Sequence, residues 1–170
     1  MSKIVIANWK ALPNTLAEAY EILNSIAAFL KDKPNLDNFS LVLCPPFVYL
    51  EEVSKTLKTL SLGNQIKLGA QDIAVTDEVG QTGEITGKQL VGLDVLYAIV
   101  GHSERRWKLG ESDETVNKKL KLALAYGFTP IVCIGEKVRD EDFRGFLKGQ
   151  INSTFAGLLG EQIKKCLIAY

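Results

Sequence analysis

Six short apolar stretches recur along the chain, and none of them alternates regularly between apolar and polar residues. Continuous apolar runs of this length are typical of parallel strands that are covered on both faces of a sheet. The predicted strands are Lys3–Ala7, Phe39–Cys44, Ile66–Ala70, Val95–Gly101, Thr129–Ile134 and Cys166–Tyr170.

Longer segments with helical periodicity separate these strands. Thr15 and Glu18 stand in capping-box spacing before one apolar face, and Ser112 is a capping residue before another. The predicted helices are Thr15–Leu30, Phe47–Thr59, Gly87–Gly92, Ser112–Tyr126 and Asp140–Leu159. Strands that alternate with helices in this way predict right-handed crossovers and a parallel sheet.

Two parallel architectures fit this order, an open doubly wound sheet and a (β/α) barrel. A dinucleotide-binding sheet carries G-x-G-x-x-G after its first strand, but the first strand here ends in Ala7-Asn8-Trp9-Lys10. The phosphate-binding loop G-x-x-x-x-G-K-[ST] is also absent from the sequence. These absences argue against a nucleotide-binding protein, and no stretch of the chain indicates a linker between two domains.

The composition is that of a globular protein, since 46% of the 170 residues are hydrophobic and 24% are charged. Twenty basic and twenty acidic side chains cancel, which argues against nucleic acid or an anionic membrane as a partner. The sequence has no apolar stretch of about 18 residues and no signal peptide pattern, so a cytoplasmic location is expected. Cys44, Cys133 and Cys166 lie far apart in apolar runs, a pattern of reduced, buried thiols rather than of disulfides or a metal site.

Polar residues follow the predicted strands, at the edge where parallel sheets bind their ligands. Asn8 and Lys10 follow the first strand, and His102, the only histidine, follows the fourth. Because a helix is expected to begin at Ser103, its dipole would disfavour the charged form of His102 and leave a neutral hydrogen-bond donor. Simpler interpretations remain open. They are local hydrogen bonds for His102, a turn for Asn8, a solvated charge for Lys10, a surface ion pair with the neighbouring arginines for Glu104, and structural pairing with a basic group for Glu136 after the fifth strand. The convergence of these residues on one edge favours a site.

Six motifs resemble successive signatures of the triosephosphate isomerase family, and they occur in the family's order and at about its spacing. They are Ala7-Asn8-Trp9-Lys10, Ala70-Gln71-Asp72, Thr82-Gly83-Glu84-Ile85, Val100-Gly101-His102-Ser103-Glu104-Arg105-Arg106, Gly110-Glu111-Ser112-Asp113 and Val132-Cys133-Ile134-Gly135-Glu136. The resemblance covers the whole chain. It implies a (β/α) TIM barrel and the interconversion of dihydroxyacetone phosphate with glyceraldehyde 3-phosphate in glycolysis and gluconeogenesis, without a cofactor or a metal.

The resemblance also implies roles for individual residues. Asn8 and Lys10 match the family's substrate-contacting pair, and Lys10 would offset the negative charge of substrate and transition state. His102 matches the electrophile that polarises the substrate carbonyl. Glu104 matches the acid beside it, which is expected to contact Lys10.

A loop with Thr82, Gly83 and Glu84 matches the segment that inserts into the neighbouring subunit in this family, so a homo-oligomer is implied. Ala11-Leu12-Pro13 and Gln81 depart from the family pattern after the first strand and in this loop. These departures weaken the expectation of the usual dimer contact.

The largest departure is at the end of the sequence. The family's catalytic base is a glutamate directly after the strand that ends here at Tyr170, and the lid and the phosphate-binding loops come later still. We therefore predict one truncated domain over residues 1–170, an incomplete (β/α) TIM barrel with about six strands and five helices of the usual eight units.

Two function classes stay open at this point. The chain is part of a triosephosphate isomerase that other residues or chains complete, or it is an inactive fragment that only folds and oligomerises. Because loss of a general base costs on the order of 10²–10⁴ in rate, the isolated chain is expected to be weakly active or inactive. The exposed edges of the first and sixth strands favour self-association or the recruitment of a C-terminal segment.

Overall fold

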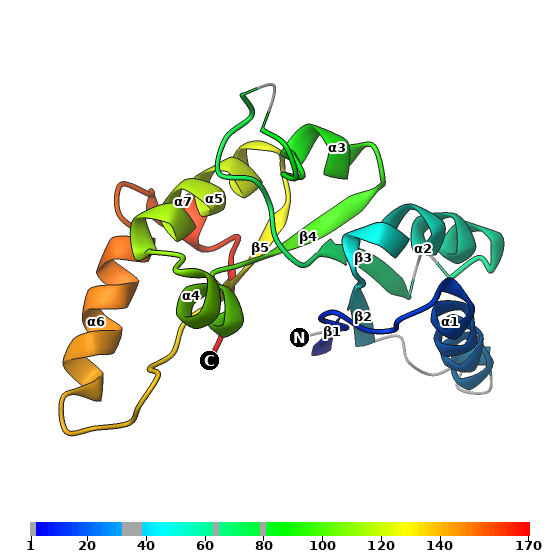
Figure 1. Ribbon diagram of the computed structural model, residues 1–170, viewed down its shortest axis with the longest axis horizontal. Coiled ribbons are helices and arrows are strands. Elements are labelled where there is room, and N and C mark those ends of the chain that lie inside the picture. The colour runs from blue at the N-terminus through cyan, green and yellow to red at the C-terminus, as the bar shows by residue number, and fades with distance from the viewer. Residues whose placement is uncertain (1–2, 32–38, 63–64, 79–80) are drawn as a thin grey trace. The chain divides into compact units, whose positions relative to one another are not determined.

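The computed structural model describes residues 3–31, 39–62, 65–78 and 81–170 (Figure 1). Its six strands are ordered β1-β2-β3-β4-β5-β6 along the sheet, and helices separate them along the chain. The chain divides into two compact units. The first comprises Met1–Gln71 and Gly92–Leu96, and the second comprises Asp72–Val91 and Tyr97–Tyr170. The prediction of a single domain over residues 1–170 stays a prediction.

The first unit contains three parallel strands and two helices. The elements are β1 (Lys3–Asn8), α1 (Leu16–Lys31), β2 (Phe39–Cys44), α2 (Phe47–Thr59) and β3 (Ile66–Ala70). The register pairs Asn8 with Cys44 at the carboxyl end of β1. The predicted capping box of α1 is confirmed, because Glu18 N donates to Thr15 Oγ1 at 3.2 Å and Thr15 N donates to Glu18 Oε2 at 3.4 Å. This cap begins a helix that buries Ala19 and Leu23.

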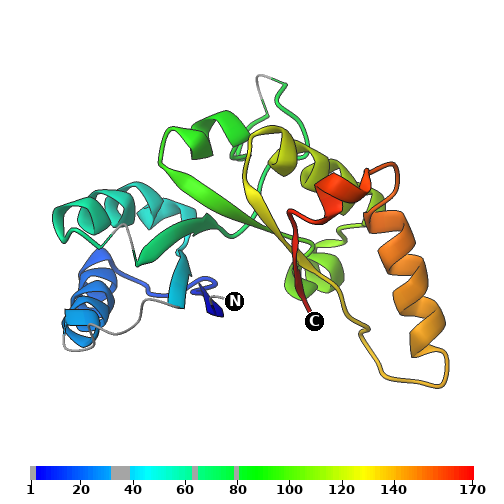
Figure 2. The same ribbon diagram turned by 180° about the vertical axis from the view of Figure 1, so that it is seen from behind.

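The second unit contains most of β4, two further strands and five helices among the residues described. The elements are α3 (Gly87–Val91), β4 (Val95–Val100), α4 (Ser103–Leu109), α5 (Asp113–Ala125), β5 (Thr129–Cys133), α6 (Phe143–Thr154), α7 (Gly160–Ile163) and β6 (Leu167–Ala169). Figure 2 shows β4, β5 and β6 side by side in green, yellow and red, and the parallel register pairs Val100 with Val132 and Cys133 with Ala169. The carboxyl ends of the three strands therefore meet at one edge.

The alternation of strands with helices and the parallel pairing confirm the prediction of an incomplete (β/α) barrel with six strands. Two helical predictions need correction. Helices α4 and α7 are not among the five predicted helices, although Ser103 is a predicted helix start. The helix expected over Asp140–Leu159 is wrong at both ends, because Asp142 N donates to Asp140 Oδ1 in a turn before α6 and Gly157 adopts a φ of +73° after it.

Candidate active site

The end of β1 holds Lys10 in an uncommon backbone conformation. Its φ is +57°, in the left-handed region that a residue with a Cβ atom enters at a cost of about 1–2 kcal/mol. Lys10 N donates to Asn8 Oδ1 at 2.9 Å, and Gln71 Nε2 donates to the carbonyl oxygens of Lys10 at 2.7 Å and of Cys44 at 2.9 Å. Two amide side chains thus fix the peptide groups on both sides of Lys10, which preserves a strained backbone at this strand end. The side chain of Lys10 is exposed.

His102 follows β4 and is the N-cap of α4. Its Nδ1 atom accepts a hydrogen bond from Glu104 N at 3.3 Å. A ring nitrogen that accepts carries no proton, so the neutral imidazole carries its proton on Nε2. His102 therefore offers one defined donor, and 22% of its side chain is exposed.

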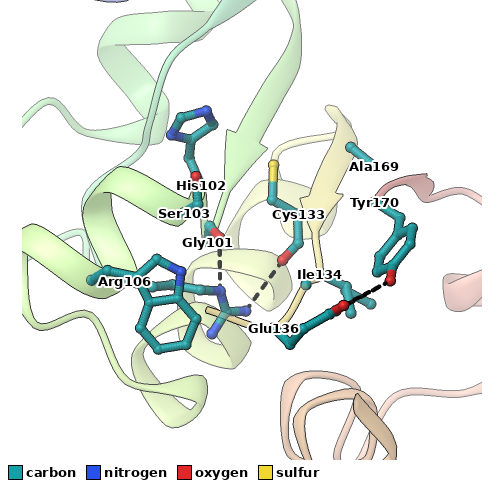
Figure 3. A pocket seen from close by; sticks show the side chains of 11 residues that line it. Gly101, His102, Ser103, Arg106, Cys133, Ile134, Glu136, Ala169 and Tyr170 are labelled. Carbon is teal, nitrogen blue, oxygen red and sulfur yellow. Dashed lines mark hydrogen bonds between the residues drawn. The ribbon is translucent and has the colours of Figure 1, made fainter. Parts of the chain in front are cut away.

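His102 lies on a pocket of about 320 Å³ at the carboxyl ends of β4, β5 and β6 (Figure 3). The residues that line this pocket are Gly101, His102, Ser103, Arg106, Trp107, Cys133, Ile134, Gly135, Glu136, Ala169 and Tyr170. Burial raises the pKa of the Cys133 thiol to about 11, although the nearby Arg106 acts to lower it. Cys133 is accordingly a neutral thiol at pH 7 and a poor nucleophile.

Glu136 is the carboxylate of this pocket, and it is already paired. Tyr170 Oη donates to both of its oxygens, at 3.1 and 3.2 Å (Figure 3). Arg139 Nε lies 3.1 Å from Glu136 Oε1. Arg139 Nη2 also donates to Tyr170 Oη at 2.8 Å. These contacts match the expectation of structural pairing for Glu136, and they make it an unsuitable general base.

Glu104 lies beside the histidine on α4. Glu104 Oε2 is 3.5 Å from His102 Nδ1, and Glu104 Oε1 is 3.7 Å from Lys108 Nζ. The expected contact of Glu104 with Lys10 stays a prediction.

Further along the chain, Thr82, Gly83 and Glu84 are exposed in a turn, and Gly83 adopts a φ of +88°. Their role at a subunit interface also stays a prediction.

A cluster of four charged side chains links α4 to α5. Lys119 Nζ on α5 donates to both carboxylate oxygens of Asp72, at 2.6 and 2.8 Å, and to Glu111 Oε1. Arg105 Nε lies 2.8 Å from Asp72 Oδ2 and from Glu111 Oε1. Burial alone would raise the pKa of Glu111, but the hydrogen bonds from Lys119 and Arg105 outweigh it and hold this pKa below its ordinary value. For Asp72, burial raises the pKa against the opposing effect of Lys119.

The sequence predicts no role for three residues that lie at or near this site: Gln71, Arg106 of the pocket lining, and Lys119. Gln71 and Arg106 occur in the strand-end motifs, so their position alone could have marked them. Lys119 had no such signal, because a lysine on an amphipathic helix is usually a solvated charge.

In the part of the chain that the structure describes, no three His, Cys, Asp or Glu side chains are grouped to hold a metal, and no helix is long and apolar enough to cross a membrane.

The family model for triosephosphate isomerase matches residues 3–170. The chain belongs to the triosephosphate isomerase family. A triosephosphate isomerase of Clostridium perfringens is 37% identical over 170 residues, covering 98% of this chain and 65% of that protein. One of Acaryochloris marina is 40% identical over 171 residues, covering the whole chain and 68% of its own length.

A triosephosphate isomerase of Clostridium botulinum is 39% identical and is likewise covered over 65% of its length. The chain therefore spans about two thirds of the length of the curated triosephosphate isomerases that it matches.

Proposed function

We propose that these 170 residues supply the electrophile and the lysine of a triosephosphate isomerase, which interconverts dihydroxyacetone phosphate and glyceraldehyde 3-phosphate. The observation that carries the proposal is the state of His102 at the end of β4. Its Nδ1 atom accepts from Glu104 N at 3.3 Å, so Nε2–H is available to polarise a substrate carbonyl. A neutral histidine in this role is a known property of triosephosphate isomerases.

The chemistry requires stabilisation of negative charge. Removing a proton from the carbon next to a carbonyl moves charge onto the carbonyl oxygen, where the Nε2–H donor of His102 would bind it most strongly in the transition state. Lys10 would add a fixed positive charge for the phosphorylated substrate, and Asn8 would help to orient it by holding the Lys10 amide at 2.9 Å. Neither group abstracts the proton from carbon.

The general base in this proposal is a residue that this chain does not supply, because the resemblance implies a glutamate directly after Tyr170. Glu136, the carboxylate in the pocket of the second unit, is an unsuitable base because it is paired with Tyr170 and Arg139. We therefore propose isomerase activity for the chain together with the segment that follows the matched region in its relatives. The chain alone is expected to turn over weakly or at background level, because a positioned base is worth on the order of 10²–10⁴ in rate.

A complementation assay tests this proposal. The purified chain is mixed with a separate polypeptide containing the part of the Clostridium perfringens protein beyond the matched region, and isomerase turnover is followed in a coupled assay. We expect turnover only when both polypeptides are present. If the mixture stays at the background of the separate polypeptides while they form a stable complex, the chain is a fragment that only folds and associates.

We also propose that the chain associates with itself or with such a C-terminal segment through its outer strands. Ile4 and Val5 on β1 are 39% and 47% exposed, and Ile168 on β6 is 56% exposed. Apolar side chains on an edge strand favour pairing with another strand.

Light scattering at micromolar concentration should therefore give an average mass above that of one chain. Val5→Lys and Ile168→Lys should lower this mass, whereas Val48→Lys, at a residue 82% exposed on α2, should leave it unchanged. A well-folded wild-type monomer under these conditions would contradict the proposal.

A further inference from the structure

Arg106 is a buried cation on the pocket-facing side of α4. Only 4% of its side chain is exposed, and Figure 3 shows its guanidinium between the backbone of Gly101 and that of Cys133. Its Nε donates to Gly101 O at 2.7 Å, its Nη2 to Cys133 O at 3.3 Å, and its Nη1 to Asp113 Oδ1 at 2.5 Å. Two donors of a buried guanidinium therefore bind backbone carbonyls at the ends of strands.

The bond to Gly101 acts directly on the histidine that follows. The carbonyl of Gly101 and the amide nitrogen of His102 belong to one planar peptide group, so fixing that oxygen also fixes the start of His102. Gly101 has a φ of +68°, and a Cβ atom there would lie 2.8 Å from Arg106 Nη2 and 2.9 Å from Val116 Cγ1. The backbone at this point thus fits closely against the guanidinium.

The bond to Cys133 extends the same support to the next two strands. The Cys133 carbonyl shares a peptide plane with Ile134 N, which donates to Ala169 O at 2.9 Å. One guanidinium therefore links the carboxyl ends of β4 and β5, and β5 in turn binds the end of β6. Hydrogen bonds therefore connect the three strand ends at the edge of the sheet where His102 lies.

Asp113 holds the guanidinium from the opposite side. It is the first residue of α5, directly after the N-cap Ser112, whose side chain accepts from Thr115 N. Thr154 Oγ1 on α6 lies 3.5 Å from both Arg106 Nη2 and Asp113 Oδ1. The position of the guanidinium is consequently set by two helices, and it transmits their position to the strand ends.

We infer that Arg106 is a positioning residue for His102, acting through the peptide group between Gly101 and His102. This inference rests on the proposed function of His102 and concerns a residue that does not touch substrate. Lysine cannot replace arginine here, because the three contacts need a planar fork of donors that point in different directions. Arg105, its neighbour, binds Asp72 and Glu111 and has no bond to a strand end among those described.

The single histidine makes the inference directly testable by nuclear magnetic resonance on the 170-residue chain. With ¹⁵N-labelled histidine, a fixed tautomer gives two well-separated imidazole nitrogen resonances, one unprotonated and one protonated. In Arg106→Lys the two resonances should move toward each other, because the orientation that lets Nδ1 accept from Glu104 is lost. Arg144→Lys, an exposed arginine on α6, is the matched control and should match the wild type. Unchanged imidazole resonances in a folded Arg106→Lys would overturn the inference.

Asp113→Asn provides a second, milder variant that decides the question if Arg106→Lys does not fold. It keeps the guanidinium but weakens the contact at 2.5 Å that holds it against the carbonyls of Gly101 and Cys133, so both carbonyl contacts should loosen. The imidazole resonances should shift in the same direction by a smaller amount. If they remain at their wild-type positions in the folded Asp113→Asn chain, Arg106 does not position His102.

A kinetic measurement on the complemented mixture separates this inference from the proposed function. Arg106→Lys should lower kcat about 10–100-fold with little change in KM, since a misplacement of about 1 Å costs up to about 10²-fold. A mixture in which the wild type has no turnover would overturn the proposed function and leave the resonance test of Arg106 intact. Equal kcat for Arg106→Lys and wild type would overturn the inference alone.

Discussion

Replacing Lys119 by methionine is expected to lower the free energy of unfolding by about 3–5 kcal/mol. The Lys119 side chain is 2% exposed, and its ammonium group binds both oxygens of Asp72, at 2.6 and 2.8 Å, and one oxygen of Glu111. Methionine fills a similar volume but leaves two buried carboxylates to share Arg105. Domains of this kind have total stabilities of about 5–15 kcal/mol, so the loss would be a large part of the whole.

Among the residues described, the surroundings of the cluster offer no group that could replace the ammonium of Lys119. The side chains of Asp72 and Glu111 are 9% and 7% exposed, so water cannot readily replace the ammonium group. Glu111 Oε2 is already buried without a hydrogen-bond partner in the described structure. A carboxylate that loses its partner at such a site is destabilised by its full desolvation free energy.

Urea unfolding of the 170-residue chain, followed by circular dichroism, measures this effect. Lys118→Met is the matched control, because Lys118 is the preceding residue of α5 and is exposed. Its midpoint should stay close to that of the wild type, since surface substitutions usually change stability by less than about 0.5 kcal/mol. Equal midpoints for the two variants would show that the cluster adds nothing to stability.

Much of the fold follows from local patterns in the sequence. The bounds of β2, α2 and β3 agree with the prediction, because apolar runs and the Pro45-Pro46 break define them. The strand ends also bring His102, Cys133 and Glu136 to one pocket as the parallel order requires.

Other features depend on contacts between distant residues and leave no local signal. Helix α4 is short and rich in charge, and the burial of Arg106 against Gly101 O and Cys133 O supports it. Lys119 looks like a surface lysine, because its partner Asp72 lies 47 residues away in the sequence. The φ of +57° at Lys10 likewise depends on the distant Gln71.

His102→Gln is expected to have the largest effect on activity. Glutamine is neutral and of similar length, but it has no imidazole ring. In His102, Nδ1 accepts from Glu104 N at 3.3 Å while Nε2–H stays available as a donor, and glutamine cannot reproduce this ring geometry. The substitution removes the group that, in the proposed function, stabilises charge on the substrate oxygen and moves protons between the oxygens. Groups of this kind contribute about 10²–10⁴ in rate, so kcat should fall by that factor.

The ratio of turnover between wild-type and His102→Gln chains, each complemented with the same C-terminal polypeptide, tests the central claim most directly. Lys148→Gln, at an exposed lysine on α6, serves as the control and should match the wild type. Circular dichroism and complex formation must be equal for the three chains. A ratio of about 10²–10⁴ is the result that the account predicts. A ratio near one, with turnover well above background, would contradict it.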